Sequence, residues 1–196
     1  MESKIFSLLA FFLIFFNCSK SQISDDTTIE IDKTIKKDTV FGYLSRNNQK
    51  FIIKEPYDQN KKRTVFIDYY KKECNVCRDF NELYEYYQAK AIFDKDNSLN
   101  IKISVEEGLS GSGFFIKCKN KKFKVLLHTF DDQSGTKFSN CRILHQNLVL
   151  NKANFVVGDS IYGKINFEIL ENSEFRGEIK HKFQGYFVTK ISEKWN

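Results

Sequence analysis

Proline, methionine and tryptophan are almost absent from this chain of 196 residues, which has one of each. With a single Pro and nine Gly, it lacks the composition of collagen-like and low-complexity proteins. Five cysteines are too few for a domain held together mainly by disulfides. Because 41% of the residues are hydrophobic, a disordered chain is excluded as well. The length indicates one domain with a substantial core.

Charge is plentiful but says little about a partner. The 31 basic and 25 acidic residues leave a formal net charge of +6, spread along the chain. Short basic clusters occur at Lys61–Arg63 and Lys121–Lys122, in expected turns. They do not form the concentrated basic surface that nucleic-acid binding requires. We therefore expect no nucleic-acid partner.

A long apolar run, Ile5–Phe16 (IFSLLAFFLIFF), follows a short polar start that carries Lys4. A helix of this length measures about 18 Å, which is too short for the apolar core of a bilayer at about 30 Å. The run is typical of the apolar part of a secretory signal peptide. We predict that residues 1–17 are a signal peptide and that the protein is exported.

Cys18 lies directly after this run, within Asn17–Ser21. Here the chain resembles bacterial lipoproteins, in which the signal ends at a cysteine that becomes the lipid-modified first residue. The resemblance implies that Cys18 is acylated and holds the protein on a membrane of the bacterial cell envelope, at the outer membrane or the periplasmic face. Signal cleavage after Ser21 is the alternative. With Cys18 acylated, the polar residues 18–38 would form a tether between the membrane and the domain.

The remaining chain, residues 39–196, has the pattern of a single mainly-β domain. From Leu99 onward, apolar and polar residues alternate with a period of two, which is typical of half-buried strands. Several such segments, each with one polar face, favour an antiparallel β-sandwich of the immunoglobulin-like or Greek-key type, and a Greek-key barrel is the alternative. The segments Val40–Leu44 and Phe51–Lys54 are expected to add a hairpin.

One hairpin can be predicted in detail. A two-residue turn at Asn120 and Lys121 would align two apolar faces by pairing Cys118 with Phe123, Ile116 with Val125, and Phe114 with Leu127. Turn and register therefore agree.

The exception to the strand pattern is residues 76–93, where apolar residues recur at helical spacing (Phe80, Leu83, Tyr84, Tyr87 and Ala91). We predict one amphipathic helix there, packed on the sheet.

Four further cysteines are candidates for disulfides in an exported protein: Cys74, Cys77, Cys118 and Cys141. Cys118 and Cys141 both take the inward phase of their expected strands. This favours a bridge between them, and two buried free thiols are the alternative.

Cys74 and Cys77 form a C-x-x-C motif before the expected helix. Residues 64–93 thereby resemble the strand–CxxC–helix opening of thioredoxin-like proteins. The resemblance implies an envelope thiol–disulfide oxidoreductase, in which a helix N-terminus lowers the pKa of the first thiol. The only proline, Pro56, precedes the motif, whereas that family carries a proline after it. We favour a structural role or a local disulfide for this pair.

No metal site, cofactor site or catalytic set is expected. His128, His145 and His181 are distant along the chain, so no second close pair completes a zinc site with the cysteines. His145 and His181 take the inward phase of their strands, as core histidines would. We therefore expect a non-catalytic lipid-anchored envelope protein whose β-sandwich binds a ligand or gives structural support. Its expected partners are the membrane, through the anchor, and an unidentified protein or envelope component; the oxidoreductase is the alternative.

Overall fold

The computed structural model describes residues 26–48, 61–73, 78–84, 86–107, 110–173 and 177–194. The mainly-β class is confirmed for these residues. Their helices are η1 (Ile35–Lys37, a 3-10 helix) and α2 (Thr39–Arg46). Their strands are β1 (Thr27–Thr28), β2 (Glu30–Ile31), β3 (Val65–Glu73), β4 (Arg78–Tyr84), β5 (Gln88–Phe93), β6 (Leu99–Glu107), β7 (Ser110–Lys119), β8 (Lys122–Asp131), β9 (Gly135–Phe138), β10 (Cys141–Leu150), β11 (Ser160–Ser173) and β12 (Gly177–Ser192).

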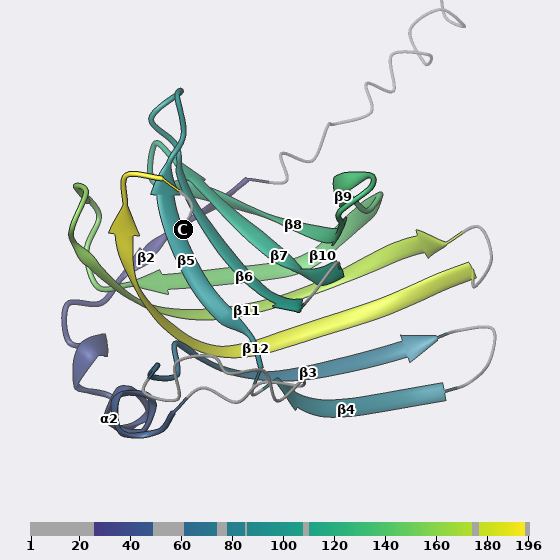
Figure 1. Ribbon diagram of the computed structural model, residues 1–196, viewed down its shortest axis with the longest axis horizontal. Helices are drawn as coiled ribbons and strands as arrows, with labels where there is room; N and C mark the ends of the chain where they lie inside the picture. The colour runs from purple at the N-terminus through teal and green to yellow at the C-terminus, as the bar shows by residue number, and fades with distance from the viewer. Residues whose placement is uncertain are drawn as a thin grey trace, which may run out of the picture.

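The strands form one sheet that curls until it is nearly closed and barrel-like (Figure 1). Its order is β1-β8-β7-β6-β5-β12-β11-β10-β2, and the pairs are antiparallel except β5–β12 and β2–β10. The sheet branches at β12, because β3 also pairs with β12 and β4 pairs with β3. The structure thus has one continuous, barrel-like sheet in place of the two stacked sheets of the favoured sandwich.

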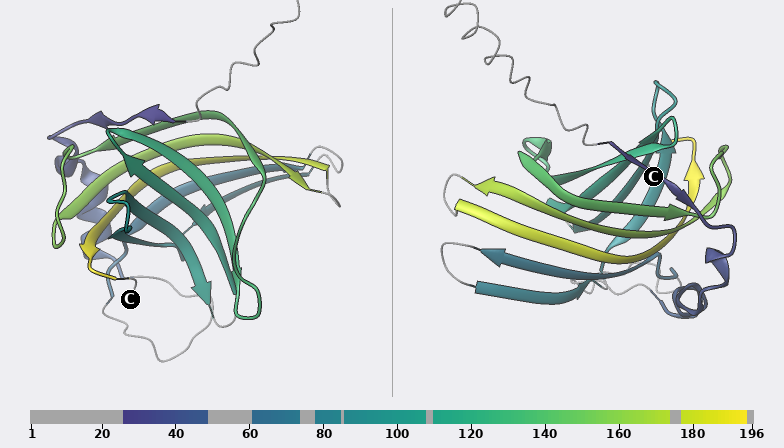
Figure 2. Two further views of the ribbon diagram at one scale, coloured as in Figure 1. Left: turned by 90° about the horizontal axis from the view of Figure 1, so that it is seen from above. Right: turned by 180° about the vertical axis from the view of Figure 1, so that it is seen from behind.

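The seam between β8 and β10 is closed by one side chain and by the N-terminal strap, Thr27–Ile31. The Gln146 side chain accepts a hydrogen bond from the Val125 amide (3.2 Å) and donates to the Phe123 carbonyl (3.4 Å) and to the Thr27 hydroxyl (2.9 Å). The strap pairs with β8 through β1 and with β10 through β2 (Figure 2). Residues 27–38, expected to belong to a polar tether, therefore contribute two strands and η1.

The main core lies inside the curled sheet. The residues predicted to point inward are buried in β6, β11 and β12: Leu99, Ile101, Ile103, Ile161, Ile165, Phe167, Ile169, Ile179, Phe183, Phe187 and Ile191. The predicted β7–β8 hairpin is confirmed as well. Asn120 and Lys121 form its turn, both with positive φ (51° and 61°), and Cys118 lies opposite Phe123 as expected.

The predicted helix at residues 76–93 is wrong. Arg78–Tyr84 is strand β4 and Gln88–Phe93 is strand β5. In β5 the buried residues Ala89 and Ala91 alternate with Lys90, which is a period of two. A short apolar segment can match both periods, and the aromatic residues of this one favour strands.

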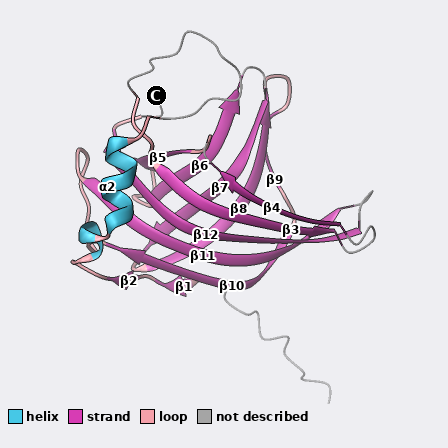
Figure 3. Cartoon of the chain, turned by 90° about the horizontal axis from the view of Figure 1, so that it is seen from below, coloured by secondary structure: helices cyan, strands magenta, loops and turns pink. Residues whose placement is uncertain are grey.

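A helix occurs instead at α2, where the Val40–Leu44 segment was expected to be a strand; Phe51–Lys54, the other half of that hairpin, lies outside the described residues. Phe41 and Leu44 of α2 are buried against the outer face of the sheet. The Phe41 ring meets the rings of Tyr162 and Tyr186 edge-on, at centroid distances of 5.1 and 5.8 Å. The helix therefore covers β11 and β12 from outside (Figure 3).

Candidate functional site

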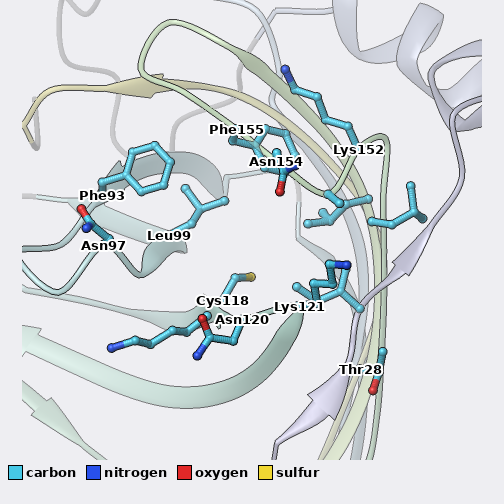
Figure 4. Close-up of a pocket in the computed structure, with 15 residues that line it drawn as sticks. Thr28, Phe93, Asn97, Leu99, Cys118, Asn120, Lys121, Lys152, Asn154 and Phe155 are labelled. Carbon is cyan, nitrogen blue, oxygen red and sulfur yellow. The ribbon is translucent and has the colours of Figure 1, made fainter.

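A pocket of about 330 Å³ lies at one end of the sheet, between the strap, the turn after β5, the β7–β8 turn and the loop after β10 (Figure 4). Its walls are mainly apolar and come from Ile29, Ile31, Phe93, Leu99, Leu150 and Phe155. The Cys118 sulfur points into the space from β7. We call this space the lysine-rimmed pocket, because three lysines line it.

Polar side chains surround the apolar walls. Three amides line the pocket, from Asn97, Asn120 and Asn154, together with Lys119, Lys121 and Lys152. None of the described residues that line it is acidic. The pocket therefore joins an apolar interior to a rim of one charge sign.

The three lysines differ in their ion pairs. Lys119 Nζ lies 2.9 Å from Asp96, and Lys152 Nζ lies 2.6 Å from Asp159. Hydrogen bonds from Ser98 and Lys119 hold the pKa of Asp96 well below its usual range, so this carboxylate stays charged. Lys121 forms no ion pair within the described part of the chain. Its ammonium group is therefore the charge most available to a ligand.

The Cys118 thiol is a wall of the pocket rather than a nucleophile. Burial raises its pKa to about 12, so it stays protonated at neutral pH. A thiol of this kind is inert, because the thiolate is the reactive form.

Cys118 and Cys141 are both free thiols in this structure, without the bridge predicted between them. Cys118 lies opposite Phe123, and the Phe123 carbonyl accepts a hydrogen bond from Gln146 in β10. Cys118 is therefore level with Gln146, whereas Cys141 begins β10 five residues earlier. Five strand residues span about 17 Å, far beyond disulfide reach. The alternation of apolar and polar residues predicted the correct face of the sheet for Cys118, but it did not predict how far Cys118 and Cys141 lie apart along the strands.

Cys18, Cys74 and Cys77 lie outside the described residues. The motif's flanks are described: Glu73 ends β3 and lies opposite Arg78, which begins β4. A strand therefore follows the C-x-x-C motif, where the thioredoxin-like resemblance implies a helix. The described residues Arg78–Tyr84 supply no helix N-terminus that would lower the pKa of a thiol at this point.

A second space, of about 280 Å³, lies at the opposite end of the sheet. We call this end, where Tyr69, Glu171 and His181 line the space, the polar end. Along β11, Gly163 lies opposite Leu150 at the pocket, whereas Glu171 lies opposite Cys141 at the polar end. There the Tyr69 hydroxyl is 2.8 Å from His181 Nδ1, and His181 Nε2 is 3.0 Å from the Glu171 carboxylate.

This chain of hydrogen bonds satisfies the buried His181. With Glu171 ionised, Nε2–H donates to the carboxylate and Nδ1 accepts from the Tyr69 hydroxyl. The prediction of a core histidine is confirmed at this position, since His181 is buried. Lys71 and Glu73 form an ion pair nearby at 2.5 Å. Tyr69, His181 and Glu171 thus bind one another at this end, whereas the ring of His128, which lines the same space, has no hydrogen-bond partner among the described residues.

The other two histidines behave differently. His145, predicted to point inward, is exposed, because a bulge between Ile143 and His145 shifts the register of β10 by one residue. His128 is buried, and neither of its ring nitrogens has a hydrogen-bond partner in the described part of the chain. Burial, and then the charge of Lys102, lowers the pKa of His128 to about 4.

No family model, curated protein or solved structure matches this chain. Within the described ranges, no group of three or more His, Cys, Asp or Glu could hold a metal ion, and no helix is long and apolar enough to cross a membrane. Sequence reasoning missed the lysine-rimmed pocket. The available signal was that Phe93 and Leu150 each end a strand next to a polar turn or loop, and that Cys118 lies one residue before the end of β7.

Proposed function

We propose that this protein is an exported lipoprotein of the bacterial cell envelope, anchored through Cys18, whose nearly closed sheet binds a small amphipathic anion. The proposal of binding depends on one observation, the apolar pocket whose charged lining residues are all lysines. The proposal of export and anchoring depends on the sequence, in which Cys18 follows the apolar run Ile5–Phe16. No catalytic role is part of this proposal.

The chemistry of the pocket favours a ligand with an apolar body and an anionic head. Burying apolar surface contributes roughly 25 cal/mol per Å², which favours a chain that fills the space between Leu99 and Phe155. Lys121 and the neighbouring amides can donate hydrogen bonds to a carboxylate or phosphate at the rim. A cation would be repelled there. A medium-chain fatty carboxylate such as laurate fits this description.

Calorimetric titration of laurate at neutral pH tests the binding. We expect Leu99→Trp to abolish it, because the indole would fill the pocket. We expect Lys121→Glu to weaken it about tenfold by removing a charge-assisted hydrogen bond. Lys122→Glu is the matched control, because it makes the same change of charge one residue away, at a position that does not line the pocket. Laurate that binds equally to wild type and Leu99→Trp would contradict the proposal, and so would dodecyltrimethylammonium binding as well as laurate.

Mass spectrometry of the protein purified from membranes tests the anchor. A diacylated Cys18 at the mature N-terminus is expected. An N-terminus at Gln22 would contradict anchoring while leaving export intact.

The oxidoreductase alternative predicts a reactive thiol at Cys74. Its reactivity towards an alkylating agent can be titrated against pH, with Cys118 as an inert reference inside the same chain. A Cys74 pKa near or below neutrality would favour the alternative over the binding function. An ordinary or permanently bridged thiol would count against it.

A further inference from the structure

Exposed apolar side chains divide between the two ends of the sheet. Phe138 and Leu144 lie towards the polar end, in β9 and the first half of β10. Ile31 at the lysine-rimmed pocket is 42% exposed, and Val156 and Val157, in the loop that supplies pocket residues up to Phe155, are 67% and 48% exposed. Ile31 lines the pocket directly, and the two valines follow Phe155, which also lines it. The mouth of the pocket therefore presents apolar groups outward as well as inward.

A braced turn holds the two valines in place. The Asp159 carboxylate accepts a hydrogen bond from the Val156 amide (2.8 Å), and the Asp159 amide donates to the Val156 carbonyl (3.1 Å). Gly158, at a φ of +90°, donates its amide to the Ile191 carbonyl at the end of β12 (2.9 Å). The turn is thus fastened to the sheet, and the exposure of Val156 and Val157 is built into its geometry.

The chain itself indicates what meets this surface. Thr27 follows Cys18 by nine residues, and nine extended residues span about 30 Å at most. An anchor at Cys18 therefore keeps the strap, whose Ile29 and Ile31 form part of the pocket wall, within that distance of a membrane. Lysines surround the same opening, and Lys121 has no ion pair among the described residues.

We infer that the mouth of the lysine-rimmed pocket docks on an anionic lipid bilayer, with Val156 and Val157 inserted at the interface. Proteins that bind a membrane interface use apolar side chains flanked by lysines. The apolar side chains enter the headgroup boundary, and the lysines contact anionic lipids. Docking in this way brings the pocket to the bilayer, so that an amphipathic anion passes between them without crossing water. The inference rests on the proposed function, because it names the membrane as the source of the ligand.

Vesicle co-sedimentation of a chain that begins at Gln22 tests the docking without the lipid anchor. This chain keeps every described residue. We expect it to sediment with phosphatidylcholine vesicles that contain about 30% phosphatidylglycerol, and more weakly with phosphatidylcholine alone. The double variant Val156→Asp, Val157→Asp is expected to lose at least about tenfold in partitioning. Leu144→Asp is the matched control, because it places one of these charges on an exposed apolar residue away from the pocket, and it should bind as wild type does.

Three results would overturn the inference: no sedimentation of the wild-type chain, an unchanged double variant, or a Leu144→Asp variant that loses as much as the double variant. Co-sedimentation that is indifferent to phosphatidylglycerol would overturn its anionic part. Titration of laurate without vesicles, on the same three chains, separates the two claims. Laurate binding without vesicle binding contradicts the docking alone, whereas vesicle binding without laurate binding contradicts the proposed function and leaves a membrane-binding surface.

Discussion

The two ends of the sheet differ in what their polar side chains contact. At the polar end, Tyr69, His181 and Glu171 bind one another in a buried chain. At the other end, polar side chains stand around an apolar space. Lys119 and Lys152 pair there with acidic residues outside the lining, and Lys121 forms no ion pair among the described residues. Polar groups that satisfy one another contribute stability, whereas an open apolar space with polar groups at its rim is suited to a ligand. Substitutions at the polar end should therefore change folding, and substitutions at the pocket should change binding.

The largest effect is expected for His181→Leu. The substitution removes the shared partner of the Tyr69 hydroxyl and the Glu171 carboxylate, so the free energy of unfolding should fall by about 3 kcal/mol. Urea denaturation measures this change. His145→Leu is the matched control, because His145 is exposed and its loss should stay within about 0.5 kcal/mol. Equal losses would mean that the buried chain contributes nothing.

His128 should make the protein sensitive to acid. The pKa of His128 is about 4 in the folded chain, below the ordinary histidine value of 6.5, so the unfolded chain binds more protons between these two pH values. The free energy of unfolding should therefore fall as the pH falls from 6.5 to 4, by about 1 kcal/mol per pH unit.

His128→Leu separates this effect from the other histidines. Because the ring of His128 has no hydrogen-bond partner among the described residues, the variant should keep its stability at pH 7 and lose part of the acid slope. Urea unfolding at several pH values measures both. A slope equal to that of the wild type would assign the acid sensitivity elsewhere.

Gln146→Leu tests the seam that lies between the two ends. The substitution removes the acceptor of the Val125 amide and the donor to the Phe123 carbonyl, so a loss of about 2 kcal/mol is expected. Hydrogen exchange should show faster exchange of the Val125 amide than of the amides in the middle of β11. Unchanged exchange at Val125 would mean that the sheet closes without this side chain.

A small effect on stability is expected for Leu99→Trp. Leu99 faces the lysine-rimmed pocket, so the larger ring has space and the cost should be about 1 kcal/mol or less. Ile101→Trp, two residues along the same face of β6, should cost about 3 kcal/mol, because Ile101 is fully buried in the core. Thermal or urea unfolding compares the pair. Equal costs would show that the pocket is not open space.

The strands could be predicted from the sequence because their signal is local. A period of two identified the inward faces of β6, β11 and β12, and the Asn120–Lys121 turn fixed the register of its hairpin. The error at residues 76–93 arose because five apolar residues matched helical spacing while the segment paired as two strands. Local periodicity does not contain the pairing that decided this case.

Features that depend on distant segments were not predictable in the same way. The seam depends on Gln146, a polar residue whose partners are more than twenty positions away along the chain. The lysine-rimmed pocket gathers residues from the strap and from turns as far apart as Asn97 and Asn154. Inward phase placed Cys118 on the correct face, but the position of Cys141 along β10 follows only from the closure of the sheet.

Amide chemical-shift mapping with laurate tests the difference between the two ends most directly. The proposed function predicts that shifts concentrate at Leu99, Cys118 and Leu150, around the pocket, while Tyr69 and His181 stay unchanged. Shifts that concentrate at Tyr69 and His181, or no shifts at all, would contradict it.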